Sequence, residues 1–277
     1  MAEHPRGVSS RRHPVVTAVL ALRRGGPGRA DGACLAEGPH LAEEGLAAGW
    51  LPVLICATPR AARRHASLVR ILERALPEPA RHPQDLPRGL WSLSDAVFAA
   101  ISATVAPQGL AVVFVPPATR TPARPPLVLA LDGVQDPGNV GTLARALLAF
   151  GGAGSALLLG PGSADPMGDK ALRASAGAAF RLRLERVHDL ADSLRGLAAQ
   201  GQRLWALVPH GGVPLSEAPL AGSTVLVVGG EGQGVSPAVR SVCAGLSIPM
   251  PGPIESLNAA QAGTLALYAF CQATRSH

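Results

Sequence analysis

Three short stretches combine glycine, proline and polar side chains at points where a buried strand is expected to end. The first is LDGVQDPGNVGTLARAL, residues 131–147, which carries an amide at Asn139 and a guanidinium at Arg145. Pro137 and Gly138 predict a turn, and asparagine is a residue type that caps helices. Arg145 then lies about two turns inside the following helix. A capped helix with a solvated arginine remains the alternative to a binding site.

The second stretch is VLVVGGEGQGVS, residues 225–236, in which four glycines follow an apolar run. Glycines at a strand end let the backbone approach a ligand closely. The stretch has neither GK[ST] nor a proper GxGxxG, which argues against a P-loop and a dinucleotide fingerprint. Glu231 also disfavours a phosphate cradle, because a carboxylate repels phosphate. It suits a cationic or hydroxyl-bearing ligand, although a simple glycine turn remains the alternative.

The third stretch is IPMPGPIESLNAAQAGTLALYAF, residues 248–270. Its prolines cannot continue a strand ladder, so the chain is predicted to leave the sheet here. The second half predicts an uncharged helix that opens with Glu255, Ser256 and Asn258. Ser256 alone would serve as a helix N-cap. A carboxylate and an amide beside it exceed what a cap requires, and they indicate a site.

These stretches need a scaffold, and the second half of the chain predicts an α/β domain. Apolar, β-rich runs alternate there with helical segments, which is typical of a mostly parallel sheet with helices on both faces. Such sheets bind ligands beyond the carboxyl ends of their strands. The predicted strands are residues 127–134, 155–161, 180–187, 203–209, 224–230 and 246–250.

The first half predicts a smaller α/β unit. Strands are expected at residues 33–38, 51–58 and 110–116, and helices at 39–49, 59–76 and 92–102. The proline-rich residues 116–126 have no hydrophobic period and indicate a linker. We therefore predict a first domain over residues 1–115 and a second over residues 127–277.

Composition limits the class of protein. Of the 277 residues, 47% are hydrophobic, enough for a substantial core. No apolar run reaches the length of a membrane span, and the N-terminus lacks the apolar region of a signal peptide. The four cysteines are far apart without a CxxC, which favours reduced thiols in a cytoplasmic protein over a zinc site. We expect no metal and no membrane partner.

The positive charge is unevenly distributed. Residues 1–126 carry 15 arginines and 9 acidic residues, whereas residues 127–277 carry 10 basic and 10 acidic residues. The whole formal excess of +6 thus lies in the first half. This suits a partner with a phosphate backbone, although a generally basic surface is the alternative. With only 3% aromatic residues, a module that stacks bases on aromatic platforms is not expected.

Taken together, the motifs DPGNVGTLARA, VVGGEGQGVS and IPMPGPIESLNAAQAG resemble, in order, those of the SpoU/TrmH class of SPOUT RNA methyltransferases. The segments CLAEGPHLAEEGLAAG and ISATVAPQGLAVV resemble the substrate-binding domain that often precedes the catalytic one, with a fold like ribosomal protein L30e. The resemblance covers nearly the whole chain. It implies a deep trefoil knot near the C-terminus, a homodimer, and S-adenosylmethionine held by the knot loops.

The resemblance also implies roles for individual residues. Methyl transfer from a sulfonium to a ribose 2′-hydroxyl requires no metal. The Arg145 position would bind the RNA phosphate and is a proposed base; because arginine stays protonated, a phosphate clamp that stabilises developing alkoxide charge is physically easier. The residues expected to position the ribose or to orient Arg145 are Asn139, Glu231, Ser256 and Asn258. Those expected to hold the cofactor are Gly230, Gly234, Ile248, Met250, Leu257 and Asn258.

Several functions stay open at this point. Ribosomal RNA of the 23S type is the favoured substrate, because family members that act on tRNA often lack the first domain, and tRNA is the runner-up. A housekeeping role and an antibiotic-resistance role are both compatible with the sequence. A catalytically silent RNA-binding protein and a nucleotide-binding oxidoreductase are the rival classes. In the third motif, Ala259 and Gln261 stand where the family usually has small or branched apolar residues, but Ser256 and Asn258 are present.

Overall fold

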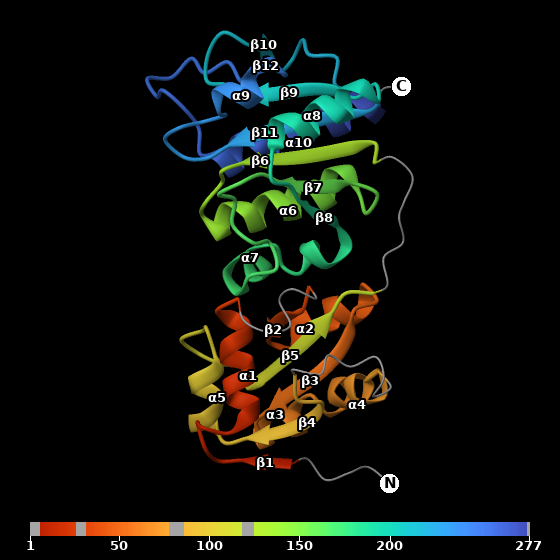
Figure 1. Cartoon of the computed structure of the whole chain (residues 1–277), viewed down its shortest axis with the longest axis vertical. Helices are drawn as coiled ribbons and strands as arrows, with labels where there is room; N and C mark the ends of the chain where they lie inside the picture. Colours follow the sequence, from red (N-terminus) through yellow and green to blue (C-terminus); the bar gives the residue numbers. More distant parts are fainter. Residues whose placement is uncertain (1–5, 26–31, 78–85, 118–124, 276–277) are drawn as a thin grey trace. The chain divides into compact units, whose positions relative to one another are not determined.

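The computed structural model describes residues 6–25, 32–77, 86–117 and 125–275. The chain forms two compact units, each with a sheet of its own (Figure 1). Unit 1 comprises Met1–Arg120 and Met167–Phe180, and unit 2 comprises Thr121–Pro166 and Arg181–His277. Most of the predicted linker, residues 118–124, lies outside the described residues.

Unit 2 is built on a seven-stranded sheet in which every pairing between neighbours is parallel. The mostly parallel sheet predicted from the alternating pattern is therefore confirmed. Its spatial order is β10-β12-β9-β11-β6-β7-β8. The strands are β6 (Leu127–Asp132), β7 (Ala156–Leu159), β8 (Arg183–Arg186), β9 (Arg203–Leu207), β10 (Val213–Pro214), β11 (Thr224–Gly229) and β12 (Ala244–Ser247).

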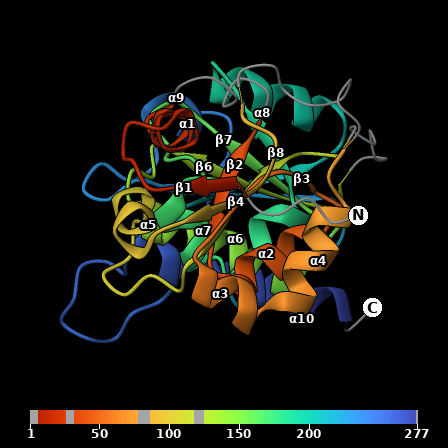
Figure 2. The same ribbon diagram turned by 90° about the horizontal axis from the view of Figure 1, so that it is seen from below.

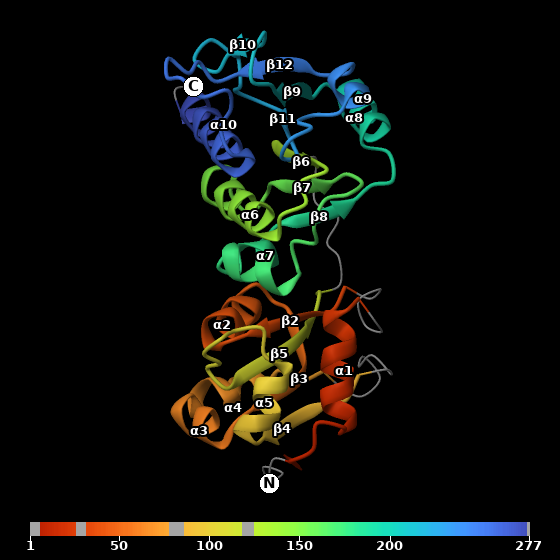
Figure 3. The same cartoon turned by 90° about the vertical axis from the view of Figure 1, so that its left-hand side faces the viewer.

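Helices cover both faces of this sheet. On one face α6 (Pro137–Gly151) and α10 (Ala259–Arg275) pack together, and on the other lie α8 (Leu190–Ala199) and α9 (Pro237–Arg240) (Figure 3). The β6 strand shows why the central predicted strands are apolar throughout. Leu129 contributes to the core under α6 and α10, whereas its neighbour Val128 contributes to the core under α8. Side chains that alternate between two buried faces leave no polar positions.

Two helix starts differ from expectation. The prediction that Asn139 caps α6 is wrong, because the carboxylate of Asp136 accepts a hydrogen bond from the Asn139 amide at 3.2 Å and occupies the cap. Asn139 is thereby placed inside the first turn. At α10, the side chain of Asn258 accepts from the Ala260 amide at 2.9 Å. Asn258 therefore caps this helix, and Ser256 lies outside it.

Unit 1 has a five-stranded mixed sheet in the order β1-β4-β3-β5-β2. Helices α2, α3 and α4 lie on one side of it and α1 on the other (Figures 2 and 3). The strands are β1 (Arg6–Val8), β2 (Cys34–Glu37), β3 (Leu51–Ala57), β4 (Gly89–Leu93) and β5 (Leu110–Val115), and the helices are α1 (Pro14–Arg23), α2 (Pro39–Ala47), α3 (Pro59–Arg64), α4 (Ala66–Arg74) and α5 (Asp95–Ile101).

The predictions for unit 1 need three corrections. The helix expected over residues 59–76 is two helices, because the backbone at His65 has φ −115° and ψ 35° and leaves the helical conformation. The helix expected from residue 92 begins at Asp95, because the residues before it form β4. Elements β1, β4 and α1 were not predicted at all. No helix in the described part of the chain is long and apolar enough to cross a bilayer.

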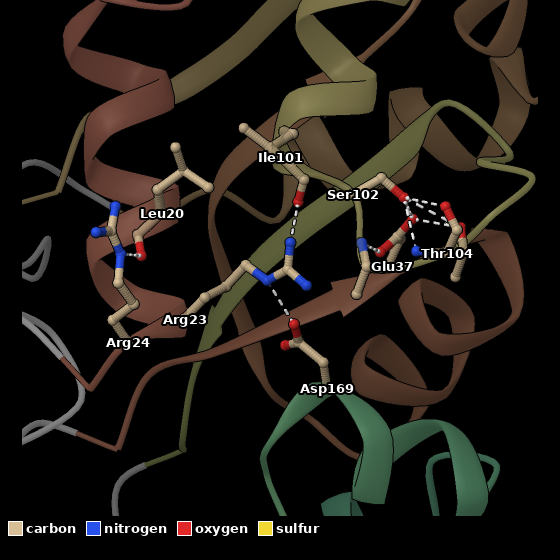
Figure 4. A network of polar contacts seen from close by, with 9 residues as sticks. Leu20, Arg23, Arg24, Glu37, Ile101, Ser102, Thr104 and Asp169 are labelled. Atoms are coloured by element: carbon tan, nitrogen blue, oxygen red, sulfur yellow. Dashed lines mark hydrogen bonds and ion pairs between the residues drawn. The ribbon is translucent and has the colours of Figure 1, made fainter.

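Residues 167–180 follow β7 in sequence but belong to unit 1. They contain α7 (Asp169–Ala174), and the carboxylate of Asp169 pairs with Arg23 Nε at 2.6 Å (Figure 4). The same guanidinium donates to the Ile101 carbonyl at the end of α5, also at 2.6 Å. Arg23 thus fixes the start of the segment to two helices of unit 1.

The far end of this segment is held by aromatic residues. The indole of Trp50 donates to the Phe180 carbonyl at 3.0 Å, and the Phe180 ring contacts both Trp50 and Phe114 edge-on. Phe180 itself is buried. A fragment cut at residue 127 would therefore lack the partners of residues 167–180, which the predicted domain limits did not anticipate.

Candidate functional site

The second and third polar stretches meet in unit 2 at a cavity of about 510 Å³. The cavity lies where the chain leaves β9, β11 and β12, at the carboxyl ends of neighbouring parallel strands. This is the place where open parallel sheets bind ligands. It is lined by Leu207, Val208, Pro209, Val228, Gly229, Gly230, Glu231, Gly232, Gln233, Gly234, Val235, Arg240, Leu246, Ile248, Met250, Ser256, Leu257, Asn258, Ala259 and Ala262.

Two of the four glycines in residues 229–234 are required by close backbone approach. A Cβ at Gly230 would overlap the carbonyl oxygen of Gly133, and one at Gly229 would overlap the backbone of Gly234. Gly234 also has φ of +64°, a conformation that other residues adopt rarely. Its amide donates to the Gly230 carbonyl at 3.0 Å and closes the loop on itself. This loop presents its backbone to the cavity.

The proline-rich stretch forms a second wall. The strand predicted to reach residue 250 ends at Ser247, so the chain leaves the sheet earlier than expected. Ile248 and Met250 then line the cavity, and Leu257 and Asn258 follow from the start of α10. All six residues predicted to hold the cofactor line this one cavity: Gly230, Gly234, Ile248, Met250, Leu257 and Asn258.

The first stretch joins this site through one contact. The side-chain amide of Asn139, in the first turn of α6, donates a hydrogen bond to the carboxylate of Glu231 on the glycine loop. Glu231 and Ser256 both line the cavity. The structure thus brings together Asn139, Glu231, Ser256 and Asn258, which come from three separate stretches of sequence.

Two predicted site residues, Asn139 and Arg145, do not line the cavity, and of these Arg145 makes no contact with a lining side chain. It is exposed on α6, and its side chain makes no ion pair or hydrogen bond with another residue that the structure describes. Six residues along an α-helix correspond to about 9 Å of rise and about 240° of rotation. Arg145 therefore projects to a different side of α6 from Asn139, away from the Glu231 contact within the same chain.

Two residues that the sequence analysis did not select lie in the cavity wall or next to it. Arg240 of α9 is, with Glu231, one of the two charged residues in the cavity wall. Asp132, at the end of β6, accepts a hydrogen bond from the Ser236 amide at 2.7 Å, at the far end of the glycine loop. A carboxylate directly after a buried strand was the signal that would have pointed to Asp132.

The Cys243 thiol lies beside this site. Burial, and secondly the negative charge of Asp132, raise its pKa to about 11, so the thiol is protonated at neutral pH. The cavity contains one carboxylate and one guanidinium among mainly apolar groups and backbone. The described residues contain no group of three or more His, Cys, Asp or Glu side chains that would hold a metal ion. This wall suits a ligand with an apolar body and charges of both signs.

Comparison with known proteins identifies relatives. Residues 126–268 match the SpoU rRNA Methylase family. The Bacillus subtilis protein named 23S rRNA (guanosine(2553)-2'-O)-methyltransferase RlmP is 33% identical over 237 residues, which cover 84% of this chain and 86% of that protein. Mycobacterial tRNA/rRNA methyltransferases also match, and the chain spans about half of their length.

Solved structures give the same picture. A TrmH-family putative RNA methyltransferase from Porphyromonas gingivalis has a TM-score of 0.73 and 32% identity, covering 94% of this chain and 97% of that one. The SpoU methyltransferase AviRb from Streptomyces viridochromogenes, in complex with AdoMet, has a TM-score of 0.77 and 25% identity, covering 92% of this chain and 96% of that one.

Proposed function

Because the chain belongs to the SpoU rRNA methylase family, we propose that it methylates a ribose 2′-hydroxyl of 23S-type ribosomal RNA with S-adenosylmethionine as donor. The observation that carries this proposal is the meeting of two separate stretches at one cavity, to which the Asn139–Glu231 hydrogen bond joins a third stretch. The Bacillus subtilis relative, which matches both halves of the chain, is named for 2′-O-methylation of 23S rRNA. This likeness favours ribosomal RNA over tRNA.

The cavity fits S-adenosylmethionine. Its volume of about 510 Å³ lies within the range of small-molecule sites. The glycine loop lines the cavity with backbone at Gly230, Gly232 and Gly234. Ile248, Met250 and Leu257 supply apolar surface for a purine. Glu231 suits the cationic part of the cofactor, and Arg240 suits its carboxylate. The cofactor supplies an activated methyl group on a sulfonium.

The protein's share of the chemistry is positioning and charge stabilisation. The attacking hydroxyl must lie in line with the methyl group, and water must be excluded. We assign this positioning to Glu231, which is oriented by Asn139, and to Ser256 and Asn258 at the opposite wall. The side-chain oxygen of Asn258 also accepts the hydrogen bond that caps α10, and this contact fixes the orientation of the Asn258 side chain. Arg145 is assigned to the RNA phosphate and to the developing alkoxide charge.

We further propose that the active form is a homodimer in the cytoplasm. The exposed position of Arg145 supports a dimer, because within one chain this residue does not line the cavity. Exposed apolar side chains support it as well, and Leu265 and Tyr268 on α10 are 43% and 49% exposed. The threading of the region around β12 and α10 into a trefoil knot is part of the same proposal and rests on family resemblance.

Unit 1 is proposed to bind the RNA. Arginines crowd the surface of α3 and α4, and none of them pairs with an acidic residue in the described part of the chain. Two of them, Arg60 and Arg64, line a groove of about 450 Å³ together with His65 and one carboxylate, that of Asp95. A groove with unpaired guanidinium groups suits a phosphate backbone. Because residues 167–180 belong to unit 1, point substitutions test this surface better than a truncation does.

Charge reversal at Arg60→Glu with Arg64→Glu is expected to weaken RNA binding by about tenfold or more at moderate salt, with a shallower salt dependence. Binding of S-adenosylmethionine should stay unchanged, because the substitutions lie in unit 1. The measurement is RNA affinity across a salt series, with Arg195→Glu on α8 as a control that reverses an exposed charge in unit 2. Equal losses of RNA affinity in both variants would contradict the assignment of this groove as an RNA-binding surface.

The proposed function itself is tested in two steps. Calorimetry should show binding of S-adenosylmethionine and its demethylated product, but no binding of NAD. Mass spectrometry of RNA treated with the enzyme should then place a new ribose methyl group in 23S-type rRNA, and Glu231→Gln should abolish it. Binding of NAD in preference to S-adenosylmethionine would contradict the cofactor, and methylation confined to tRNA would contradict the substrate. Cofactor binding with no methylated RNA would identify a silent RNA-binding protein.

A further inference from the structure

Asp132 holds both ends of the glycine loop that forms one wall of the cavity. Its main-chain carbonyl accepts a hydrogen bond from the Gly230 amide at 2.9 Å, where the loop begins. Its carboxylate accepts from the Ser236 amide at 2.7 Å, where the loop ends. Every residue between these two points, 231–235, lines the cavity. One residue of β6 therefore closes a loop that belongs to β11 and α9.

The carboxylate is the specific part of this arrangement. Pairing of β6 with β11 places Asp132 beside Gly229, so the carbonyl contact follows from the sheet ladder. The ladder does not extend to Ser236, and the side chain of Ser236 makes no capping hydrogen bond for α9. The amide at the start of α9 is satisfied by Asp132 instead. Hydrogen bonds from amides to ionised carboxylates are among the stronger ones in proteins.

We propose that Asp132 is a positioning residue for the cofactor site, which pre-organises the glycine loop for S-adenosylmethionine through its clasp on Gly230 and Ser236. The inference rests on the proposed assignment of the cavity to this cofactor. Asp132 does not line the cavity. Its effect is conveyed through the loop, whose backbone faces the ligand. A loop already closed before binding loses less conformational freedom when the ligand arrives.

The Cys243 thiol lies close to Asp132. Burial, and secondly the negative charge of Asp132, raise the pKa of this thiol to about 11. Cys243 packs against the core beneath α8 and α9. The carboxylate is thus half-buried at the junction of β6, the glycine loop and α9, where its position is fixed on several sides.

The test is calorimetry and kinetics on Asp132→Ala in the full chain. We expect the dissociation constant for S-adenosylmethionine to rise by about 10- to 100-fold, the range for losing a hydrogen bond to a charged group. The rate at saturating cofactor should stay within about threefold of wild type, and the KM for RNA should not change, because a bound cofactor reorders the loop. Asp132→Asn keeps an acceptor oxygen without the charge. Its dissociation constant for S-adenosylmethionine should therefore lie between those of the wild type and Asp132→Ala.

The matched control is Asp189→Ala. Asp189 caps α8 in the same unit, and its carboxylate accepts from the Asp192 amide at 2.9 Å, but it does not line or adjoin the cavity. The Asp189→Ala variant should lose a comparable hydrogen bond at a helix start and keep the wild-type affinity for S-adenosylmethionine. Hydrogen exchange of the free protein should speed up at residues 230–236 in Asp132→Ala and stay unchanged there in Asp189→Ala. Equal effects of the two variants on cofactor affinity would overturn the proposal.

A second variant removes the donor instead of the acceptor. Ser236 has φ of −61°, which suits proline, so Ser236→Pro deletes the amide hydrogen without demanding a new backbone angle there. It should weaken cofactor binding as Asp132→Ala does. In the double variant, the dissociation constant for S-adenosylmethionine should exceed that of either single variant by no more than about twofold, because both substitutions remove the same hydrogen bond. If Asp132→Ala does not fold, this variant decides by the same criterion. Wild-type affinity in both would refute the clasp, whereas no cofactor binding by the wild type would refute the proposed function.

Discussion

Arg145→Ala is expected to lower the rate of methyl transfer by about two to four orders of magnitude, the range for losing a positioned charge or proton-transfer group. Binding of S-adenosylmethionine should be nearly unchanged, because Arg145 does not line the cavity. The residue is exposed and makes no ion pair with another described residue, so its removal should not destabilise the fold. Single-turnover rates and calorimetry on the purified variant measure both quantities.

Arg145→Lys separates the two roles considered for this side chain. Lysine keeps the charge and loses the planar fork that grips a phosphate with two hydrogen bonds. A phosphate clamp predicts partial recovery of the rate, with the remaining loss in RNA affinity. A general base predicts normal RNA affinity and a rate that rises with pH towards about 10, because lysine has the lower pKa. Arg195→Ala on α8 is the control for a general loss of positive charge.

A wild-type rate of methyl transfer in Arg145→Ala would exclude Arg145 both as a phosphate clamp and as a general base. The catalytic assignment would then shift to the groups that line the cavity, Glu231 above all. Loss of cofactor binding in Arg145→Ala would instead contradict the placement of this residue outside the cavity wall. Each result is informative because the structure gives Arg145 no other interaction among the described residues that the substitution would disturb.

The arrangement of unit 2 could be predicted from the sequence because its signals are local and repeated. Each buried strand is a continuous apolar run, and three of them end in glycine, proline or polar residues. Parallel strands bring their carboxyl ends to one edge, so the second and third stretches had to lie near each other. The Asn139–Glu231 contact joins residues 92 positions apart, and the sequence placed both at strand ends without showing that they touch.

Other features depend on partners that no local pattern specifies. Asp136 and Asn139 both suit a helix cap, and the backbone geometry at Asp136 decided between them. The partner of Asp132 lies 104 residues further along the chain, so the clasp was invisible in sequence. Residues 167–180 are helical in pattern, but their place in unit 1 is set by Arg23 and Trp50. Tertiary contacts of this kind override what propensity suggests.

Gly230→Ala is expected to abolish measurable binding of S-adenosylmethionine, with a loss of about 100-fold or more. A Cβ at this position would overlap the Gly133 carbonyl oxygen and lie 3.0 Å from its carbonyl carbon, and both atoms are backbone that cannot rotate away. The loop must move, and Glu231 moves with it. Gly252→Ala is the control, because a Cβ there meets nothing within 4 Å. Normal cofactor affinity in Gly230→Ala would show that the glycine loop is not the cofactor wall.

This variant also tests how the proposed homodimer would divide the two roles between its subunits. Gly230→Ala destroys a cofactor loop and leaves Arg145 intact, whereas Arg145→Ala does the reverse. Since Arg145 projects away from the cavity of its own chain, we expect it to serve the site of the partner subunit. A mixed dimer of the two variants then contains one complete site and should recover up to about half of the activity per dimer, although each variant alone is inactive. If Arg145 serves its own chain, both sites of the mixed dimer are incomplete, and mixing should restore nothing.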